Sequence, residues 1–311
     1  MGSNPTLSAI SRADDFRRDE SHREGRTALG PFRHLRHLRL RLDVVLLLLL
    51  SPVFATFGCA TSPTGRTQLL LHSEMQMAEM GRAAFADLQS KTAASTKPEE
   101  VRYVRCVADA ITNTLTRQDL RSVVVDAWEV EVFDDPTANA FALPGGKIGV
   151  HAGMLDVAVS ADQLAAVLGH EVGHVLARHV NERVTQQMAA SGSIEALQVI
   201  FGADTEAKVQ LLGAIGMGLQ YGVLLPFGRA QESEADVIGI ALMARAGFDP
   251  RESVSLWRNM ARASNGQNPP EFLSTHPSHS TRIRLLEDQM SSALILYNQA
   301  RAAGRRPDCR R

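Results

Sequence analysis

The chain has 311 residues, of which 44% are hydrophobic and 22% charged, so it is long and apolar enough to bury a sizeable core. A formal net charge of −1 and an aromatic content of 5% give no indication of a nucleic-acid partner. The composition excludes a disordered chain and a polytopic membrane protein, and three cysteines are too few for a disulfide scaffold or a Cys-based zinc module.

The first sixty residues have the order of an export signal. Residues 1–43 form a polar, Arg-rich leader, and the apolar segment that follows runs to Phe57, just before Gly58 and Cys59. About fourteen apolar residues are too few for a spanning helix, which needs roughly twenty. The order of basic residues, apolar segment, small residue and cysteine is typical of a secretory signal, and the position of Cys59 resembles a bacterial lipoprotein cleavage site. We therefore expect residues 44–59 to direct export and Cys59 to be lipidated.

Two helices are predicted next. Ser73 and Gln76 form a capping box that opens a helix to about residue 89. Pro98 is a good first residue for a second helix, whose apolar side chains recur on one face from residue 101 to residue 115. Cys106 lies about 140° from that face, so we place it at the periphery, and the sequence leaves open whether Cys106 and Cys309 pair.

A small sheet follows these helices. Apolar and acidic residues alternate over 128–132, which predicts a half-buried strand. Residues 139–143 and 147–151 are expected to form a hairpin around the turn Pro144-Gly145-Gly146.

The rest of the chain is predicted to be helical. Ser160 caps a single long helix to about Ala190, and residues 194–227 carry charges that favour packed or surface helices over a membrane span. We expect further helices at 230–246, from Asp249-Pro250 onward and at 281–302, with a loop at 265–280 and a disordered tail at 304–311. No internal repeat is present, so residues 60–303 should form one domain.

One motif in the long helix carries chemistry. His170 and His174 are four residues apart, so their imidazoles project about 40° from each other and can share one metal ion. Glu171 points beside that ion, where it can reach a bound water. Two imidazoles with an open position fit zinc in a catalytic site. On a continuous helix, His179 would lie 180° around the axis from His170, so it is excluded as a ligand.

The third ligand has to come from elsewhere, and residues 231–236 are the candidate. Glu232 and Asp236 share one helix face, so Glu232 could bind the metal while Asp236 accepts a hydrogen bond from a ligand imidazole. Glu234 points about 160° away from both, and its replacement by alanine is therefore expected to be nearly silent. The alternative is that these acids merely collect in a first helical turn, where the helix dipole favours them.

Together these motifs resemble metallopeptidase family forty-eight, the gluzincins that include HtpX and the CaaX prenyl endopeptidases, and in particular its compact, exported LoiP-like branch. The resemblance runs from about residue 65 to residue 288 and rests on the segments 139–146, 170–179 and 232–236, and on Thr275-His276-Pro277-Ser278 with Arg282. It implies an α+β fold, mainly helical and zincin-like, with a small β-sheet and the active-site helix just described. It also implies one Zn²⁺ per chain.

The resemblance assigns roles to single residues. His170, His174 and Glu232 would be the zinc ligands, Glu171 the general base and Asp236 the partner of a ligand. His276 and Arg282 would lie near the carbonyl oxygen in the transition state, with Arg282 orienting the substrate. The residues Asn139, Ala140, Phe141 and Ala142 resemble an edge strand to which an extended substrate can add by main-chain hydrogen bonds.

The function expected is zinc-dependent cleavage of unfolded or misfolded envelope proteins, as part of protein quality control. The enzyme would lie on the periplasmic side of the bacterial cell envelope, lipid-anchored to a membrane through its amino-terminal segment. No nucleic-acid partner is expected, and the oligomeric state is not readable. Two alternatives stay open: a membrane-tethered, chaperone-like module with a vestigial metal site, and a zinc hydrolase of a non-peptide amide.

Overall fold

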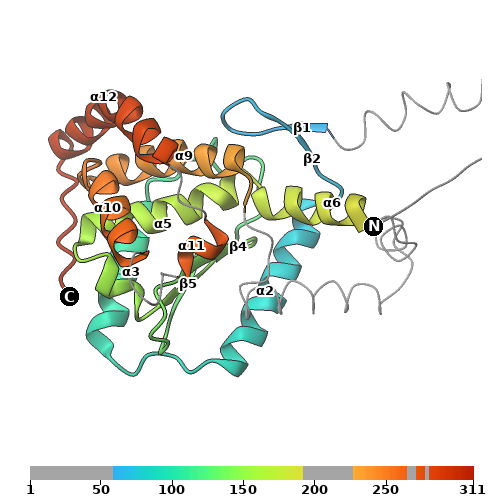
Figure 1. The fold of residues 1–311 in the computed structure, drawn as a ribbon, viewed down its shortest axis with the longest axis horizontal. Coiled ribbons are helices and arrows are strands. Elements are labelled where there is room, and N and C mark those ends of the chain that lie inside the picture. Colours follow the sequence, from blue (N-terminus) through green and yellow to red (C-terminus); the bar gives the residue numbers. More distant parts are fainter. Residues whose placement is uncertain (1–58, 192–226, 265–270, 277–279) are drawn as a thin grey trace, which may run out of the picture. The chain divides into compact units, whose positions relative to one another are not determined.

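The computed structural model describes residues 59–191, 227–264, 271–276 and 280–311, and the elements named below lie within these ranges. The strands are β1 (Cys59–Thr61), β2 (Thr67–Leu69), β3 (Glu129–Phe133), β4 (Ala140–Leu143) and β5 (Lys147–His151). The helices are α2 (Glu74–Lys91), α3 (Pro98–Thr112), α4 (Met154–Val157), α5 (Ala161–Leu176), α6 (His179–Ser191), α9 (Arg229–Ala246), α10 (Glu252–Ser264), α11 (Phe272–Thr275) and α12 (Ser280–Ala302). This confirms the predicted α+β class, mainly helical with small sheets (Figure 1).

The helix boundaries follow the capping signals of the sequence. The Ser73 side chain accepts the backbone N–H of Gln76, whose own side chain accepts the Ser73 N–H, so the predicted capping box opens α2. Pro98 begins α3, and Gly247 ends α9 in the left-handed conformation, with φ of 94°.

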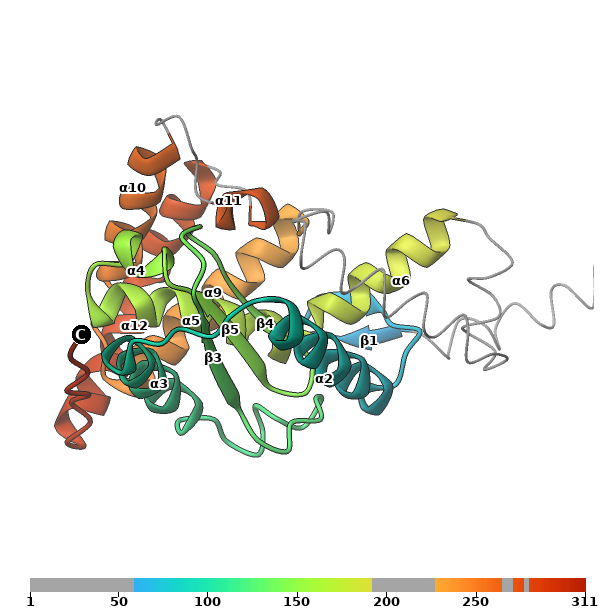
Figure 2. The same cartoon turned by 90° about the horizontal axis from the view of Figure 1, so that it is seen from below.

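The predicted strand and hairpin form a three-stranded sheet of order β3-β5-β4 (Figure 2). β5 pairs parallel to β3 and antiparallel to β4, which leaves β4 at an edge. The His151 N–H donates to the Asn139 carbonyl, which sets the register of the hairpin. Along an antiparallel strand, the backbone N–H and C=O groups of successive residues point alternately toward and away from the neighbouring strand. Since those of Asn139 face β5, the backbone groups of Ala140 and Ala142 point away from it.

The long helix predicted from Ser160 to about Ala190 is wrong as one element. It ends at Leu176, and α6 begins at His179 after a sharp turn in which Arg178 has a φ of 57°. No Gly or Pro marks this break. A tertiary contact stabilises it instead, because the buried Gln68 amide donates to the Ala177 carbonyl that would otherwise continue the helix.

Helices α5 and α9 run side by side at very short range (Figure 1). A Cβ atom added to Gly169 would lie 2.8 Å from the Gly239 carbonyl oxygen, and one added to Gly239 would lie 2.7 Å from the His170 nitrogen. Only glycine permits this approach of the two backbones. It brings the first turns of α9 against the part of α5 that carries the histidine motif.

The carboxyl-terminal tail is not disordered, contrary to the prediction. A disulfide joins Cys309 to Cys106 on α3, 203 residues away in sequence, so Cys106 is also more than a peripheral residue. The Arg305 side chain donates to the Arg245 carbonyl, and that of Arg311 donates to the Leu155 carbonyl. A covalent link and hydrogen bonds thus order a segment whose composition alone indicated disorder.

Several predictions concern residues outside the ranges that the structure describes. The leader and the apolar segment up to residue 58 lie outside the described residues, and so does most of the region 194–227. The predicted loop 265–280 is partly described, and there it contains the short helix α11. Among the described helices, none is long and apolar enough to span a membrane.

Candidate metal centre

The two motif histidines face one another on α5. Their Nε2 atoms are 3.0 Å apart and both rings are buried, as expected for residues four apart on a helix. Opposite them, α9 contributes Glu232, whose two carboxylate oxygens each lie 3.5 Å from one of these nitrogens, Oε2 from His170 and Oε1 from His174.

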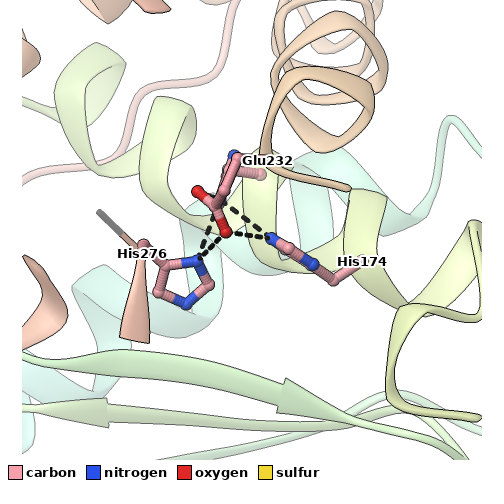
Figure 3. Close-up of side chains that lie close together, drawn as sticks. His174, Glu232 and His276 are labelled. Carbon is pink, nitrogen blue, oxygen red and sulfur yellow. Dashed lines mark hydrogen bonds and ion pairs between the residues drawn. The ribbon is translucent and has the colours of Figure 1, made fainter. Parts of the chain in front are cut away.

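A fourth donor comes from the segment after α11. Nδ1 of His276 lies 3.0 Å from Glu232 Oε1 and 3.2 Å from His170 Nε2. Figure 3 shows His174, Glu232 and His276 pointing toward one another from three separate elements. Within the described ranges, His170, His174, Glu232 and His276 form the one group whose donor atoms, all within 4.8 Å of one another, could hold a metal ion.

These spacings fit a small tetrahedral ion. Ligand atoms bound to zinc at about 2.0–2.1 Å are roughly 3.3 Å apart, close to the 3.0–3.5 Å found between neighbouring donor atoms here. The electrostatics also favour a cation. Although burial and Arg282 lower the pKa of His170, the contacts with Asp236 and Glu232 raise it to about 9. Asp236 and Glu232 therefore favour positive charge on the His170 ring, whereas burial and the neighbouring His170 lower the pKa of His174.

Glu171 lies beside this cluster without joining it. Its Oε1 atom is buried, is 3.4 Å from His276 Nε2 and has no hydrogen-bond donor. Burial raises the pKa of the carboxyl group, while its backbone hydrogen bond with Ala142 on the edge strand works in the opposite direction. Glu171 is thus a buried acid with one oxygen open to a further partner.

The contact expected between Asp236 and a motif histidine is present, with Asp236 Oδ1 3.0 Å from His170 Nδ1. Because the carboxylate accepts this hydrogen bond, Nδ1 carries a proton, and the Nε2 lone pair of the neutral ring faces the cluster.

Arg282 differs from its predicted role. Its guanidinium is buried above the ring of Trp257, donates to both Asp236 oxygens at 2.6 Å and lies 2.5 Å from Glu232 Oε2. It therefore contacts the acids of the site rather than a space where a substrate could lie.

His276 lies where a catalytic group could act, but both of its ring nitrogens face carboxylates. Nδ1 lies 3.0 Å from Glu232 Oε1, and Nε2 lies 3.4 Å from Glu171 Oε1 without a hydrogen bond between them. Nε2 is therefore the ring nitrogen that is open to a further partner.

Sequence reasoning missed the surroundings of His179 and Glu234. The angle used to exclude His179 as a ligand assumed a continuous helix, yet His179 starts α6 and its Nδ1 lies 2.9 Å from Nδ1 of His174. His179 is not one of the four converging residues, but burial lowers the pKa of its ring and Glu234 contacts it on the other side. Glu234 does point away from the cluster, but it is buried. No local signal reveals this arrangement, because it depends on the break after Leu176.

Comparisons with known proteins agree with this geometry. The model of Peptidase family M48 matches residues 99–290. The "Mitochondrial metalloendopeptidase OMA1" of Schizosaccharomyces pombe is 40% identical over 169 residues, 54% of this chain and 48% of the relative. The Danio rerio "Metalloendopeptidase OMA1, mitochondrial" is 32% identical over 261 residues, 81% of this chain and 54% of the relative.

A bacterial relative also matches. The "Beta-barrel assembly-enhancing protease" of Escherichia coli K12 is 27% identical over 221 residues, which cover 66% of this chain and 45% of that protein. The chain thus spans about half the length of the curated relatives it matches.

Proposed function

Because this chain belongs to Peptidase family M48, we propose that it is a zinc-dependent metalloendopeptidase that cleaves unfolded or misfolded envelope proteins. The observation that carries the proposal is the convergence of His170, His174 and Glu232, from two helices, around one point beside the buried carboxyl of Glu171. Two imidazoles and one carboxylate are the ligand set of a catalytic rather than a structural zinc site.

In this proposal His170, His174 and Glu232 hold one zinc ion per chain. A zinc ion in such a site lowers the pKa of water to roughly 7 and polarises the carbonyl group of the bond to be cleaved.

Glu171 acts as the general base and then as the acid. Its unpartnered Oε1 takes the proton of the attacking water, and the carboxyl passes this proton to the nitrogen of the leaving amine. The raised pKa of the buried carboxyl suits both steps, because a stronger base takes the proton more readily at neutral pH.

His276 and Arg282 are assigned different parts. His276 donates a hydrogen bond from an Nε2–H group to the oxygen of the cleaved carbonyl, since Nε2 is the ring nitrogen that lies beside Glu171. Arg282 is a positioning residue, since its guanidinium holds Asp236 and Glu232 and thereby the two carboxylates on which the ligand geometry depends.

The substrate adds to the edge formed by Asn139, Ala140, Phe141 and Ala142, the last three of which belong to strand β4. The backbone groups of Ala140 and Ala142 point away from β5, and Ala142 already hydrogen-bonds the Glu171 carboxylate. An extended peptide paired to this edge would run past the general base. Such pairing recognises main chain rather than side chains, which suits unfolded proteins as substrates.

The place of action proposed is the periplasmic side of the cell envelope, with a lipid anchor at Cys59. Cys59 is a free, exposed thiol at the start of β1. The disulfide between Cys106 and Cys309 supports export, because disulfides persist in oxidising compartments.

Digestion of casein by the purified protein, with and without a chelator and with Glu171→Gln as control, tests this function. Chelator-sensitive cleavage that is lost in the variant is expected. A chaperone-like module would instead bind unfolded casein without cutting it, and a hydrolase of other amides would leave casein intact while cleaving a cell-wall amide.

A further inference from the structure

A continuous line of buried contacts leads from the ligand His174 away from the metal centre. His174 Nδ1 lies 2.9 Å from His179 Nδ1, and His179 Nε2 lies 3.1 Å from Glu234 Oε2. All three side chains are at most 4% exposed, so water does not compete for these contacts.

The chemistry of the last member sets the direction of every hydrogen bond in this line. A carboxylate only accepts, so the Nε2–H of His179 donates to Glu234. A neutral His179 then has an acceptor at Nδ1, and His174 donates its Nδ1–H there. The Nε2 lone pair of His174 is thereby left facing the cluster, as metal binding requires.

The amino-terminal hairpin of β1 and β2 holds Glu234 in place. The Thr64 hydroxyl donates to Glu234 Oε1 at 2.6 Å, and Arg66 Nε donates to Glu234 Oε2 at 3.0 Å. The two terminal nitrogens of Arg66 also donate to the two oxygens of Glu182 on α6 at 2.6 Å. This bidentate ion pair holds the hairpin against α6. Because Arg66 also contacts Glu234, the same ion pair helps to hold the carboxylate that orients His179.

The hairpin also contacts the helix break that His179 follows. Arg178 donates to the Thr61 carbonyl, and Gln68 donates to the carbonyl of Ala177. The hairpin therefore acts on His179 twice, once through the backbone turn that places the ring and once through the carboxylate that fixes its tautomer.

We propose that Glu234, held by Arg66, positions the ligand imidazole of His174 through His179, so that the β1–β2 hairpin is part of the metal centre. The hairpin lies outside residues 99–290, the range matched by the family model. This inference rests on the proposed zinc site and replaces the expectation that Glu234 is dispensable. Since Cys59 begins β1, the hairpin also links the predicted anchor point to the proposed metal ligands.

The test measures zinc binding rather than hydrolysis. Zinc affinity is determined by competition with a fluorescent chelator, and the visible spectrum of the Co²⁺-loaded protein reports ligand geometry. Glu234→Leu removes the acceptor at nearly constant size. Glu234→Gln can keep an oxygen toward His179, because the Thr64 hydroxyl can turn to accept from the new amide, and only the long 3.4 Å bond from the Thr64 N–H is lost. Arg66→Met removes the contacts that Arg66 makes with Glu234 and Glu182. Its control is Arg82→Met, because Arg82 forms an exposed ion pair with Asp126.

We expect Glu234→Leu to weaken zinc binding by about 10- to 100-fold and to change the Co²⁺ spectrum. Arg66→Met should weaken binding less, while Glu234→Gln and Arg82→Met should stay close to the wild type. Circular dichroism of the metal-free proteins shows whether each variant is folded.

Three outcomes would overturn the inference. One is wild-type zinc affinity in folded Glu234→Leu. Another is an equal loss in Glu234→Gln, which would mean that charge and not the hydrogen bond matters. The third is failure of both Glu234 variants to fold, since the network would then determine folding rather than metal binding. Failure of the proposed function is distinguishable, because the wild-type protein itself would then bind no zinc.

Discussion

Replacing Glu171 by glutamine separates the chemical step from metal binding. Glutamine has nearly the same shape, and its amide oxygen can still accept the backbone N–H of Ala142. It cannot take a proton from water at neutral pH. Because Glu171 is not among the four converging residues, the variant should bind zinc as tightly as the wild type.

The size of the loss follows from the role assigned to Glu171. A positioned general acid–base group contributes typically 100- to 10,000-fold to the rate, which corresponds to about 3–5 kcal/mol of activation free energy. His276, the nearest imidazole, lies 3.4 Å from Glu171 and is assigned to the carbonyl oxygen of the substrate rather than to the attacking water. We therefore expect kcat to fall by this full factor.

Stability provides a second measurement on the same variant. Burial raises the pKa of Glu171 in the folded protein, so the wild-type protein loses stability as pH rises through that pKa. Glutamine does not ionise, so the variant does not lose stability in this way. The melting temperature of metal-free Glu171→Gln should therefore be no lower than that of the wild type at pH 7–8.

Hydrolysis of a fluorogenic peptide, zinc content after dialysis and the melting temperature are measured in parallel. Substantial cleavage by zinc-loaded Glu171→Gln would refute the mechanism. Loss of zinc from the variant would refute the distinction between the base and the ligands.

Further predictions concern the ligand set, the tail and one surface ion pair. Glu232→Ala should remove most of the zinc affinity, because a ligand and its negative charge are lost, whereas Asp236→Ala should weaken it by only about 10- to 100-fold; zinc content after dialysis decides, and the reverse order would contradict the assignment. Cys309→Ser should lower the free energy of unfolding of the oxidised protein by about 2–4 kcal/mol, because the disulfide closes a 203-residue loop, and an unchanged denaturant midpoint would count against it. Burial raises the pKa of Asp119, but its hydrogen bonds with Arg245 and with the preceding turn outweigh this and lower the pKa to about 2. The ion pair therefore contributes stability above about pH 4 that is lost as pH falls toward 2. In Asp119→Asn the melting temperature should consequently depend less on pH between 4 and 2 than it does in the wild type.

Local rules predicted the helices and the hairpin correctly where the signal itself is local. The capping box at Ser73, the proline that opens α3 and the glycine that ends α9 act within one or two helical turns, so their meaning does not depend on distant residues. The same holds for the turn between β4 and β5.

The sequence by itself identified the residues of the candidate metal centre: two imidazoles and an acid at helical spacing, and a second helix whose face presents Glu232 and Asp236. It could do so because the spacing of side chains on one helix follows from backbone geometry alone. Only the tertiary structure decided the break before His179, the pairing of Cys106 with Cys309 and the burial of Arg282. Each of these depends on a partner far away in the chain. Such a long-range contact produces no periodic pattern of residues in the sequence around it.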